Sequence, residues 1–129
     1  MARQKSPHLT DAELRLMEVL WAKGRAATVS EVLEGLPAKP ALAYSTVITT
    51  LRILEEKGYV RHKKDGRAFQ YEPLIGRQDA RRSALQQVLH RFFEGSPELL
   101  MASLFESGEI DAAEFRRLRR LIENAGRKS

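Results

Sequence analysis

Cationic side chains gather in one short stretch of the chain, and their spacing suits the binding of an anion. Residues 57–67 hold five Lys and Arg but a single acid, Asp65, which gives this segment a net charge of +4. The five cations are Lys57, Arg61, Lys63, Lys64 and Arg67. Cations placed against phosphates release condensed counterions, which favours binding to a nucleic acid. The segment therefore predicts an anionic partner, and the net charge of +5 over all 129 residues permits one.

Short hydroxylic side chains form the outer face of a helix expected just before this segment. Ser45 and Thr49 lie one turn apart, Ile48 flanks them, and Arg52 follows one turn later. Short hydroxyls let a helix approach bases and phosphates closely, and Ile48 is suited to a thymine methyl group. A solvated face without a partner would carry more Lys and Glu. This pattern predicts contact with DNA.

The residue types that perform catalysis or hold metals are scattered. His8, His62 and His90 show no paired ligand spacing, and Ser45 has no His and acid partner in its sequence context. The sequence has no phosphate-binding loop, no dinucleotide-binding glycine motif and no cysteine. We therefore expect no enzyme, no catalytic residue, no bound metal and no cofactor.

The composition is that of a folded, soluble protein, with 43% hydrophobic and 30% charged residues. No apolar run approaches the roughly 20 residues that a membrane helix needs. The first ten residues are polar and lack the apolar centre of a signal peptide. The sequence predicts a cytoplasmic protein with no membrane partner.

Two capping boxes mark the first two helices. Thr10 with Glu13 predicts a helix that Gly24 ends, and Thr28 with Glu31 predicts a short helix that stops before residue 37. The third helix should begin near 43–45 and run to 58. The side chains on its expected buried face are Tyr44, Val47, Leu51 and Leu54.

A change to strand periodicity follows the third helix and predicts a β-hairpin. Asp65-Gly66 is a favoured two-residue turn in which both central positions need a positive φ. Pairing outward from that turn places Lys64 opposite Arg67. Like charges in such a pair destabilise a hairpin, so the pair favours an anionic partner, with a merely soluble tip as the alternative. The residues expected on the core side are Val60, His62, Phe69 and Tyr71.

Helical patterns resume over residues 76–129, a segment too short to form a separate core unaided. Two interleaved copies would bury its apolar side chains, and packing back on residues 1–75 is the alternative. The side chains expected in a dimer interface are Leu85, Val88, Leu89, Phe92, Phe93, Leu100, Leu104, Phe105, Phe115, Leu118, Leu121 and Ile122.

The order of three helices followed by a hairpin is that of a winged helix. The expected fold class is mainly α with a small β-hairpin wing. It comprises a winged helix-turn-helix DNA-binding domain over 1–75 and a C-terminal helical dimerisation domain over 76–129. In such a domain the third helix enters the major groove of DNA, and the hairpin reaches the phosphates beside it.

Two segments resemble the penicillinase repressor (BlaI/MecI) family. The recognition helix and wing of that family are similar to AYSTVITTLRILEEKGYVRHKKDGRAFQYEPL, and its first helix is similar to LTDAELRLMEVLW. The resemblance spans roughly residues 8–125. It implies a homodimeric repressor that binds inverted repeats in promoters of β-lactamase, penicillin-binding-protein or copper-transport genes. The contacts it implies with DNA are Ser45, Thr46, Thr49, Lys63, Lys64 and Arg67, to which the helix-face argument adds Ile48 and Arg52.

Two properties of that family are not matched. Antibiotic-responsive members are inactivated by proteolysis at an Asn-Phe bond, where this chain has Ser103-Leu104 by position. The alternative is a regulatory protease that cleaves this chain with another specificity. Copper-responsive members carry a cysteine cluster near the C-terminus, and a chain without cysteine lacks that switch.

Two other functions use the same fold. A winged helix that serves as a protein adaptor predicts no sequence-selective DNA binding. A regulator that responds to a small molecule predicts a pocket between its domains and a ligand that changes DNA affinity. The leading hypothesis is a dimeric repressor bound to a double-stranded operator.

Overall fold

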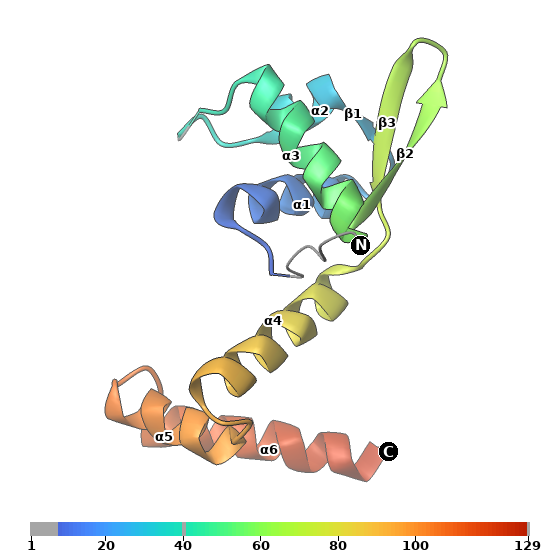
Figure 1. Ribbon diagram of the computed structural model, residues 1–129. Helices are drawn as coiled ribbons and strands as arrows, with labels where there is room; N and C mark the ends of the chain where they lie inside the picture. The colour runs from blue at the N-terminus through green and yellow to red at the C-terminus, as the bar shows by residue number, and fades with distance from the viewer. Residues whose placement is uncertain (1–7, 40, 129) are drawn as a thin grey trace, which may run out of the picture. The chain divides into compact units, whose positions relative to one another are not determined.

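The computed structural model describes residues 8–39 and 41–128 (Figure 1). Residues 1–7, most of the polar N-terminal segment considered above, lie outside the described residues. The chain divides into two compact units, Met1–Ala84 and Leu85–Ser129, and each is described by itself. In the described part of the chain no helix combines the length and the apolar character needed to cross a bilayer.

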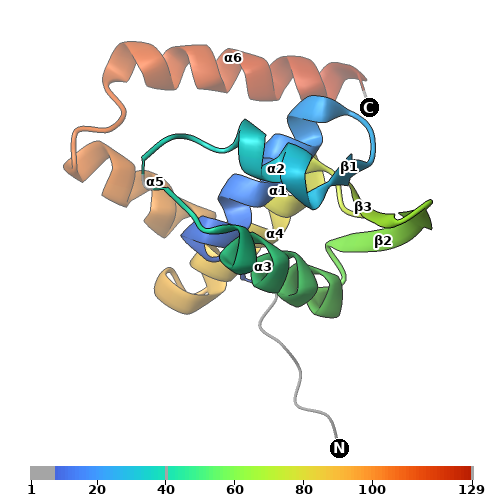
Figure 2. The ribbon, with the colours of Figure 1, turned by 90° about the horizontal axis from the view of Figure 1, so that it is seen from above.

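The first unit is a winged helix with a small sheet. Its elements are α1 (Asp11–Lys23), β1 (Ala27–Thr28), α2 (Val29–Gly35), α3 (Tyr44–Lys57), β2 (Val60–Asp65), β3 (Ala68–Pro73) and the start of α4 (Arg77–Phe92). The strands form one antiparallel sheet in the order β1-β3-β2. In both ribbon views the hairpin of β2 and β3 projects away from the three helices (Figures 1 and 2). The predicted fold class is confirmed. The two-residue strand β1 was not predicted, because it is too short to show a period.

Both predicted capping boxes are present. The Glu13 backbone N–H donates to Thr10 Oγ1 at 3.2 Å, and the Thr10 N–H donates to Glu13 Oε1 at 2.9 Å. Thr28 and Glu31 repeat the arrangement at the start of α2 with the same two distances. These bonds satisfy backbone donors that a helix start otherwise leaves unpaired, and so they fix where α1 and α2 begin.

The core of the first unit lies between the three helices and the base of the hairpin. Its largest fully buried side chains are Leu16, Met17, Leu20, Val32, Val47, Leu51, Leu54 and Val60. On the predicted inner face of the third helix, burial is confirmed for Val47, Leu51 and Leu54. The prediction is wrong for Tyr44, which is 50% exposed. Tyr44 is the first residue of α3 and does not belong to the core cluster.

The hairpin register differs from the prediction by one residue at the turn. Asp65 pairs with Ala68, and Lys64 pairs with Phe69 rather than with Arg67. Gly66 has φ +66°, and Asp65 is not among the residues with positive φ. A positive φ at the first central position alone is the pattern of a type II′ turn, which makes Gly66 and Arg67 the loop. The prediction that Lys64 and Arg67 pair across the strands and repel each other is therefore wrong.

The predicted core side of the hairpin is only partly buried. Val60 and Tyr71 are 1% and 7% exposed, whereas His62 and Phe69 lie on the same face but remain exposed. Residues that alternate along a strand share a face, so the face was predicted correctly. The hairpin extends beyond the helices that would cover it, and burial therefore stops short of its tip (Figure 1).

The second unit contains the end of α4, α5 (Pro97–Glu106) and α6 (Ala112–Lys128). Ser96 Oγ accepts the Leu99 N–H at 3.1 Å, and Asp111 and Glu114 bond each other's backbone N–H groups at 2.8 and 3.2 Å. The rings of Phe105 and Phe115 lie 5.3 Å apart. Among the described side chains of this unit, none is buried.

Candidate nucleic-acid interface

The outer face of α3 presents the polar side chains expected there. Ser45, Thr46, Thr49 and Arg52 are exposed, and Ile48 is half-buried. Thr50, by contrast, is turned inward and donates its hydroxyl to the Thr46 carbonyl at 2.7 Å. A helix face with short exposed hydroxyls and one longer cation can approach the edges of bases.

Lys57 does not belong to the exposed cationic cluster that the sequence predicted. Its Nζ lies 2.7 Å from Glu13 Oε1 and 2.8 Å from the His8 carbonyl oxygen, and its side chain is 8% exposed. The lysine therefore ties the end of α3 to the start of α1. Sequence reasoning missed this pair because its members lie 44 positions apart.

Arg61 is also engaged by the fold. Its Nε donates to Glu72 Oε1 at 2.6 Å across the strands β2 and β3. The bond to Arg61 is the main cause that lowers the pKa of Glu72 below its usual value. The expected cluster of five cations is thus reduced to Lys63, Lys64 and Arg67.

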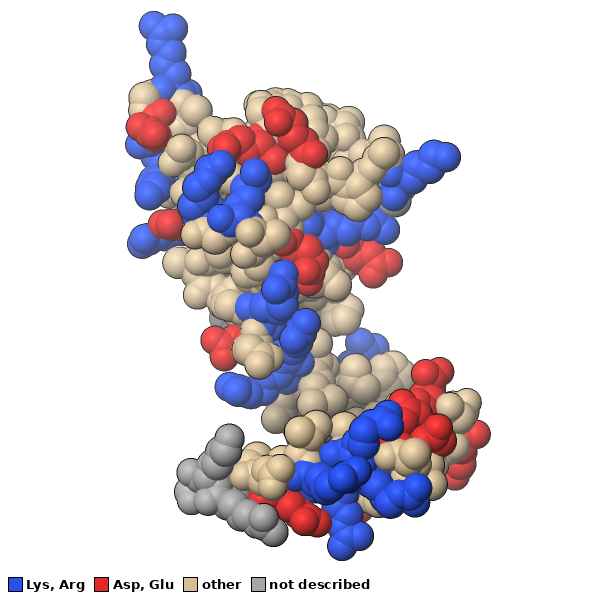
Figure 3. All heavy atoms as spheres, turned by 180° about the vertical axis from the view of Figure 1, so that it is seen from behind, with Lys and Arg blue, Asp and Glu red and all other residues tan. Residues whose placement is uncertain are grey.

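Four cations near the wing remain without an acid partner. Among the residues that the structure describes, Arg52, Lys63, Lys64 and Arg67 form no ion pair, and all four are exposed. Lys and Arg side chains project from the wing, at the upper left of Figure 3. Unpaired exposed cations on one projecting element are the electrostatic footprint of a polyanion-binding surface.

A hydrogen-bonded pair joins α3 to the wing. His62 Nδ1 lies 2.6 Å from Glu55 Oε2, and the His62 backbone N–H donates to the same carboxylate at 3.2 Å. The imidazole also packs edge-on against Phe69, with ring centroids 5.0 Å apart. This pair links the wing to the helix, and sequence reasoning missed it because Glu55 and His62 lie on different elements, seven residues apart.

A hollow opens between α3 and the wing. It has a volume of about 640 Å³, and its lining includes Tyr44, Ile48 and Arg52 of α3 together with Arg67 and Phe69 of the hairpin. We call it the helix–wing hollow. Tyr44 and Phe69 are each 50% exposed. Burial is the main cause that raises the pKa of Tyr71 at its inner end, while Glu55 raises it further and Arg52 opposes both. Arg52 and Tyr71 both line the hollow.

The sequence profile of the penicillinase repressor family matches residues 9–124. The chain belongs to this family. The penicillinase repressor of Bacillus licheniformis is 30% identical over 120 residues, which are 93% of each chain. The transcriptional regulator BlaI of Mycobacterium tuberculosis is 40% identical over 75 residues, 58% of this chain and 54% of that protein.

The fold of this penicillinase-repressor family member is also similar to that of a solved domain. The solution structure of the DNA-binding domain of the repressor BlaI matches with a TM-score of 0.50 and 36% identity. The match covers 60% of this chain and 93% of that domain. As a member of the family, the chain is a DNA-binding transcriptional repressor and not an enzyme. Among the described residues of this repressor, no group of three or more His, Asp or Glu side chains is placed to hold a metal.

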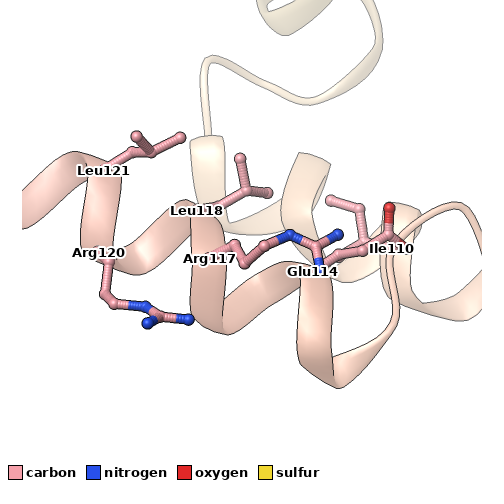
Figure 4. A pocket seen from close by; sticks show the side chains of 6 residues that line it. All are labelled: Ile110, Glu114, Arg117, Leu118, Arg120 and Leu121. Carbon is pink, nitrogen blue, oxygen red and sulfur yellow. The ribbon is translucent and has the colours of Figure 1, made fainter.

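The second unit of the repressor exposes most of the side chains expected in a dimer interface. Eight of the twelve are exposed, and Leu121 and Ile122 reach 64% and 71%. The other four, Leu89, Phe93, Leu100 and Leu104, are half-buried. A hollow of about 520 Å³ lies along α6, where Leu118 and Leu121 project from one side and Arg120 from the other (Figure 4). So much apolar surface on three short helices is unusual for a folded unit without a partner.

The bond that corresponds by position to the family's cleavage site lies inside a helix. Ser103 and Leu104 belong to α5, with Ser103 exposed and Leu104 half-buried. Proteolysis of a folded chain proceeds through locally opened states. Cleavage at this bond would therefore require α5 to unwind first, and a regulatory protease as a partner stays a prediction.

Proposed function

We propose that this chain represses transcription in the cytoplasm as a homodimer bound to an inverted-repeat operator. In each copy α3 enters the major groove and the wing lies on the neighbouring phosphates. The observation that carries the proposal is the juxtaposition of an exposed hydroxylic helix face with three wing cations that form no ion pair within residues 8–39 and 41–128. The two surfaces offer different chemistry, as sequence reading and phosphate binding require.

The outer face of α3 reads the bases in this proposal. Arg52 has the reach and the two parallel donors to bond a guanine edge, and Ile48 suits a thymine methyl group. Ser45, Thr46 and Thr49 are short enough to let the helix backbone come close. None of these five side chains is buried in the first unit, so each is available for such contacts.

The wing supplies affinity rather than sequence selection. Lys63, Lys64 and Arg67 bind phosphates, and each neutralised phosphate releases counterions. The carboxylate of Glu55 is hydrogen-bonded to the ring and to the backbone N–H of His62. The wing is therefore oriented by its own contacts to α3 before DNA binds.

Each predicted domain has one function in this proposal: residues 1–75 bind DNA, and residues 76–129 form the dimer. What supports a dimer is the apolar surface of the second unit, which has no buried side chain among those described. A second copy would bury that surface, since a unit of this size cannot build a core alone. Two-fold symmetry of the protein then matches an inverted repeat.

The test measures binding of the full chain to duplexes selected from random sequence, over a range of salt concentrations. Wild type should select an inverted repeat, with affinity that falls steeply as salt rises. Arg52→Ala should lose selectivity at one position of each half-site, at a cost of about 1–3 kcal/mol, and Lys64→Ala should flatten the salt slope by about 1 for each copy bound.

The matched control is Arg61→Ala, which removes a wing cation that Glu72 already engages. This variant should leave the salt slope close to that of wild type. The proposal fails if wild type selects no sequence, which is the outcome expected of a protein adaptor. The assigned contact surface is wrong if Arg52→Ala and Lys64→Ala both bind the operator as wild type does.

A further inference from the structure

We propose that the helix–wing hollow seats the sugar–phosphate unit of one operator nucleotide, with the ring of Phe69 against the deoxyribose. This rests on the proposed function and deepens it, because it assigns a specific contact to a residue outside the cationic and hydroxylic set. The occupant is a segment of DNA backbone rather than a base.

Phe69 is an exposed aromatic ring that packs against a neighbouring side chain. It is 50% exposed, yet its ring packs against His62 at 5.0 Å. His62 is itself held by Glu55 of α3. An aromatic side chain that already packs on one side has less conformational entropy to lose when a ligand covers the other side.

The hairpin register places a cation next to this ring. Lys64 pairs directly with Phe69 across the strands, so both side chains lie on the face that carries His62 and Tyr71. That face turns toward α3, as the bond between His62 and Glu55 requires. The apolar ring and the ammonium group are therefore presented together.

Each wall of the hollow also contributes a guanidinium group. Arg52 comes from α3 and Arg67 from the turn of the wing. Among the described residues that line the hollow, Glu55 is the only acid, and its carboxylate is occupied by His62. The hollow thus combines an apolar surface with cations on two sides.

This combination matches the chemistry of a DNA strand. A deoxyribose has an apolar C–H face and lies between two phosphates, which two cations can bind. The hollow also lies between the surface that reads bases and the tip of the wing, where a strand must pass if both surfaces touch DNA. A thymine methyl group is the other apolar group that DNA offers, and the test separates the two.

The experiment uses the full chain and the operator selected from random sequence. Nucleotides of one half-site are replaced singly, either by a tetrahydrofuran unit, which keeps the sugar ring and lacks the base, or by a propyl spacer, which lacks both. At one position the wild type should tolerate the tetrahydrofuran unit but lose about fivefold or more in affinity with the propyl spacer. With Phe69→Ala the two replacements at that position should cost the same.

A matched variant controls for simple loss of packing. Phe69→Leu keeps an apolar surface and should stay within about twofold of wild type, whereas Phe69→Ala should lose about fivefold. If the tetrahydrofuran unit costs as much as the spacer at every position, the hollow does not hold a sugar and the inference is overturned. Equal operator binding by Phe69→Ala and wild type overturns it as well. If wild type selects no operator, the proposed function fails first and this inference fails with it.

Discussion

The ammonium group of Lys57 and the carboxylate of Glu13 form a buried ion pair, with Nζ 2.7 Å from Oε1. The two side chains are 8% and 5% exposed. The same carboxylate oxygen closes the capping box of α1 by accepting the Thr10 N–H. One acid therefore fixes both the start of α1 and the position of the last turn of α3, the helix proposed to enter the major groove.

Removal of one member of this pair should destabilise the first unit strongly. Lys57→Met leaves Glu13 as a buried charge without its cation, and we expect a loss of about 3 kcal/mol in the free energy of unfolding. Urea denaturation measures it. Arg61→Met breaks an exposed pair instead and should cost no more than about 1 kcal/mol. Equal losses in the two variants would contradict the structural role assigned to Lys57.

The contacts of Glu31 with Arg25 and with the start of α2 should make stability depend on pH. Glu31 has its pKa lowered from the usual 4.5 to about 2, chiefly by the hydrogen bond from Arg25 and then by the Thr28 backbone N–H. A carboxyl whose pKa is lower in the folded state stabilises that state above the unfolded pKa. This contribution is present above pH 4.5 and is lost as the pH falls toward about 2.

Unfolding measured between those pH values should reveal this dependence. Glu31→Gln should reduce the loss of stability on acidification, because the neutral side chain has no proton to gain. Glu34→Gln, which removes an exposed acid of the same helix outside the capping box, is the control. An unchanged pH profile for Glu31→Gln would disprove the contribution.

The turn of the wing should tolerate an alanine in place of Asp65 better than an alanine in place of Gly66. Gly66 has φ +66° with open space around it, so an alanine there is strained by the backbone alone. We expect Gly66→Ala to lose about 1 kcal/mol of stability, and Asp65→Ala to lose less. Thermal unfolding compares the two variants. A larger loss for Asp65→Ala would favour the turn that the sequence predicted.

The exposed apolar side chains of α6 should control the oligomeric state. Ile122→Arg places a charge at a side chain that is 71% exposed in one chain and buried in the proposed dimer. Sedimentation equilibrium should then detect a monomer, and affinity for the full operator should fall about a hundredfold while half-site binding persists. Leu14→Arg, which adds the same charge at an exposed apolar residue of α1, is the control and should remain dimeric. A dimeric Ile122→Arg variant would exclude this part of α6 from the interface.

The sequence alone predicted the elements whose signals are local. The capping boxes at Thr10 and Thr28 use partners three residues away, and the apolar spacing of α3 repeats within one turn. Such signals are readable because the groups that interact are neighbours along the chain. The resemblance in the third helix and wing was likewise contained in a continuous segment, and it identified the family.

The tertiary structure decided which of the predicted side chains are free to bind. Lys57 and Arg61 have the same residue types as the other wing cations, but acids brought close by folding engage them. The hairpin register pairs Phe69 with Lys64, and it differs from the register that the Asp65-Gly66 dipeptide predicted. Charge pairing and exposure depend on distances between residues far apart in sequence, and only the packed chain fixes those distances.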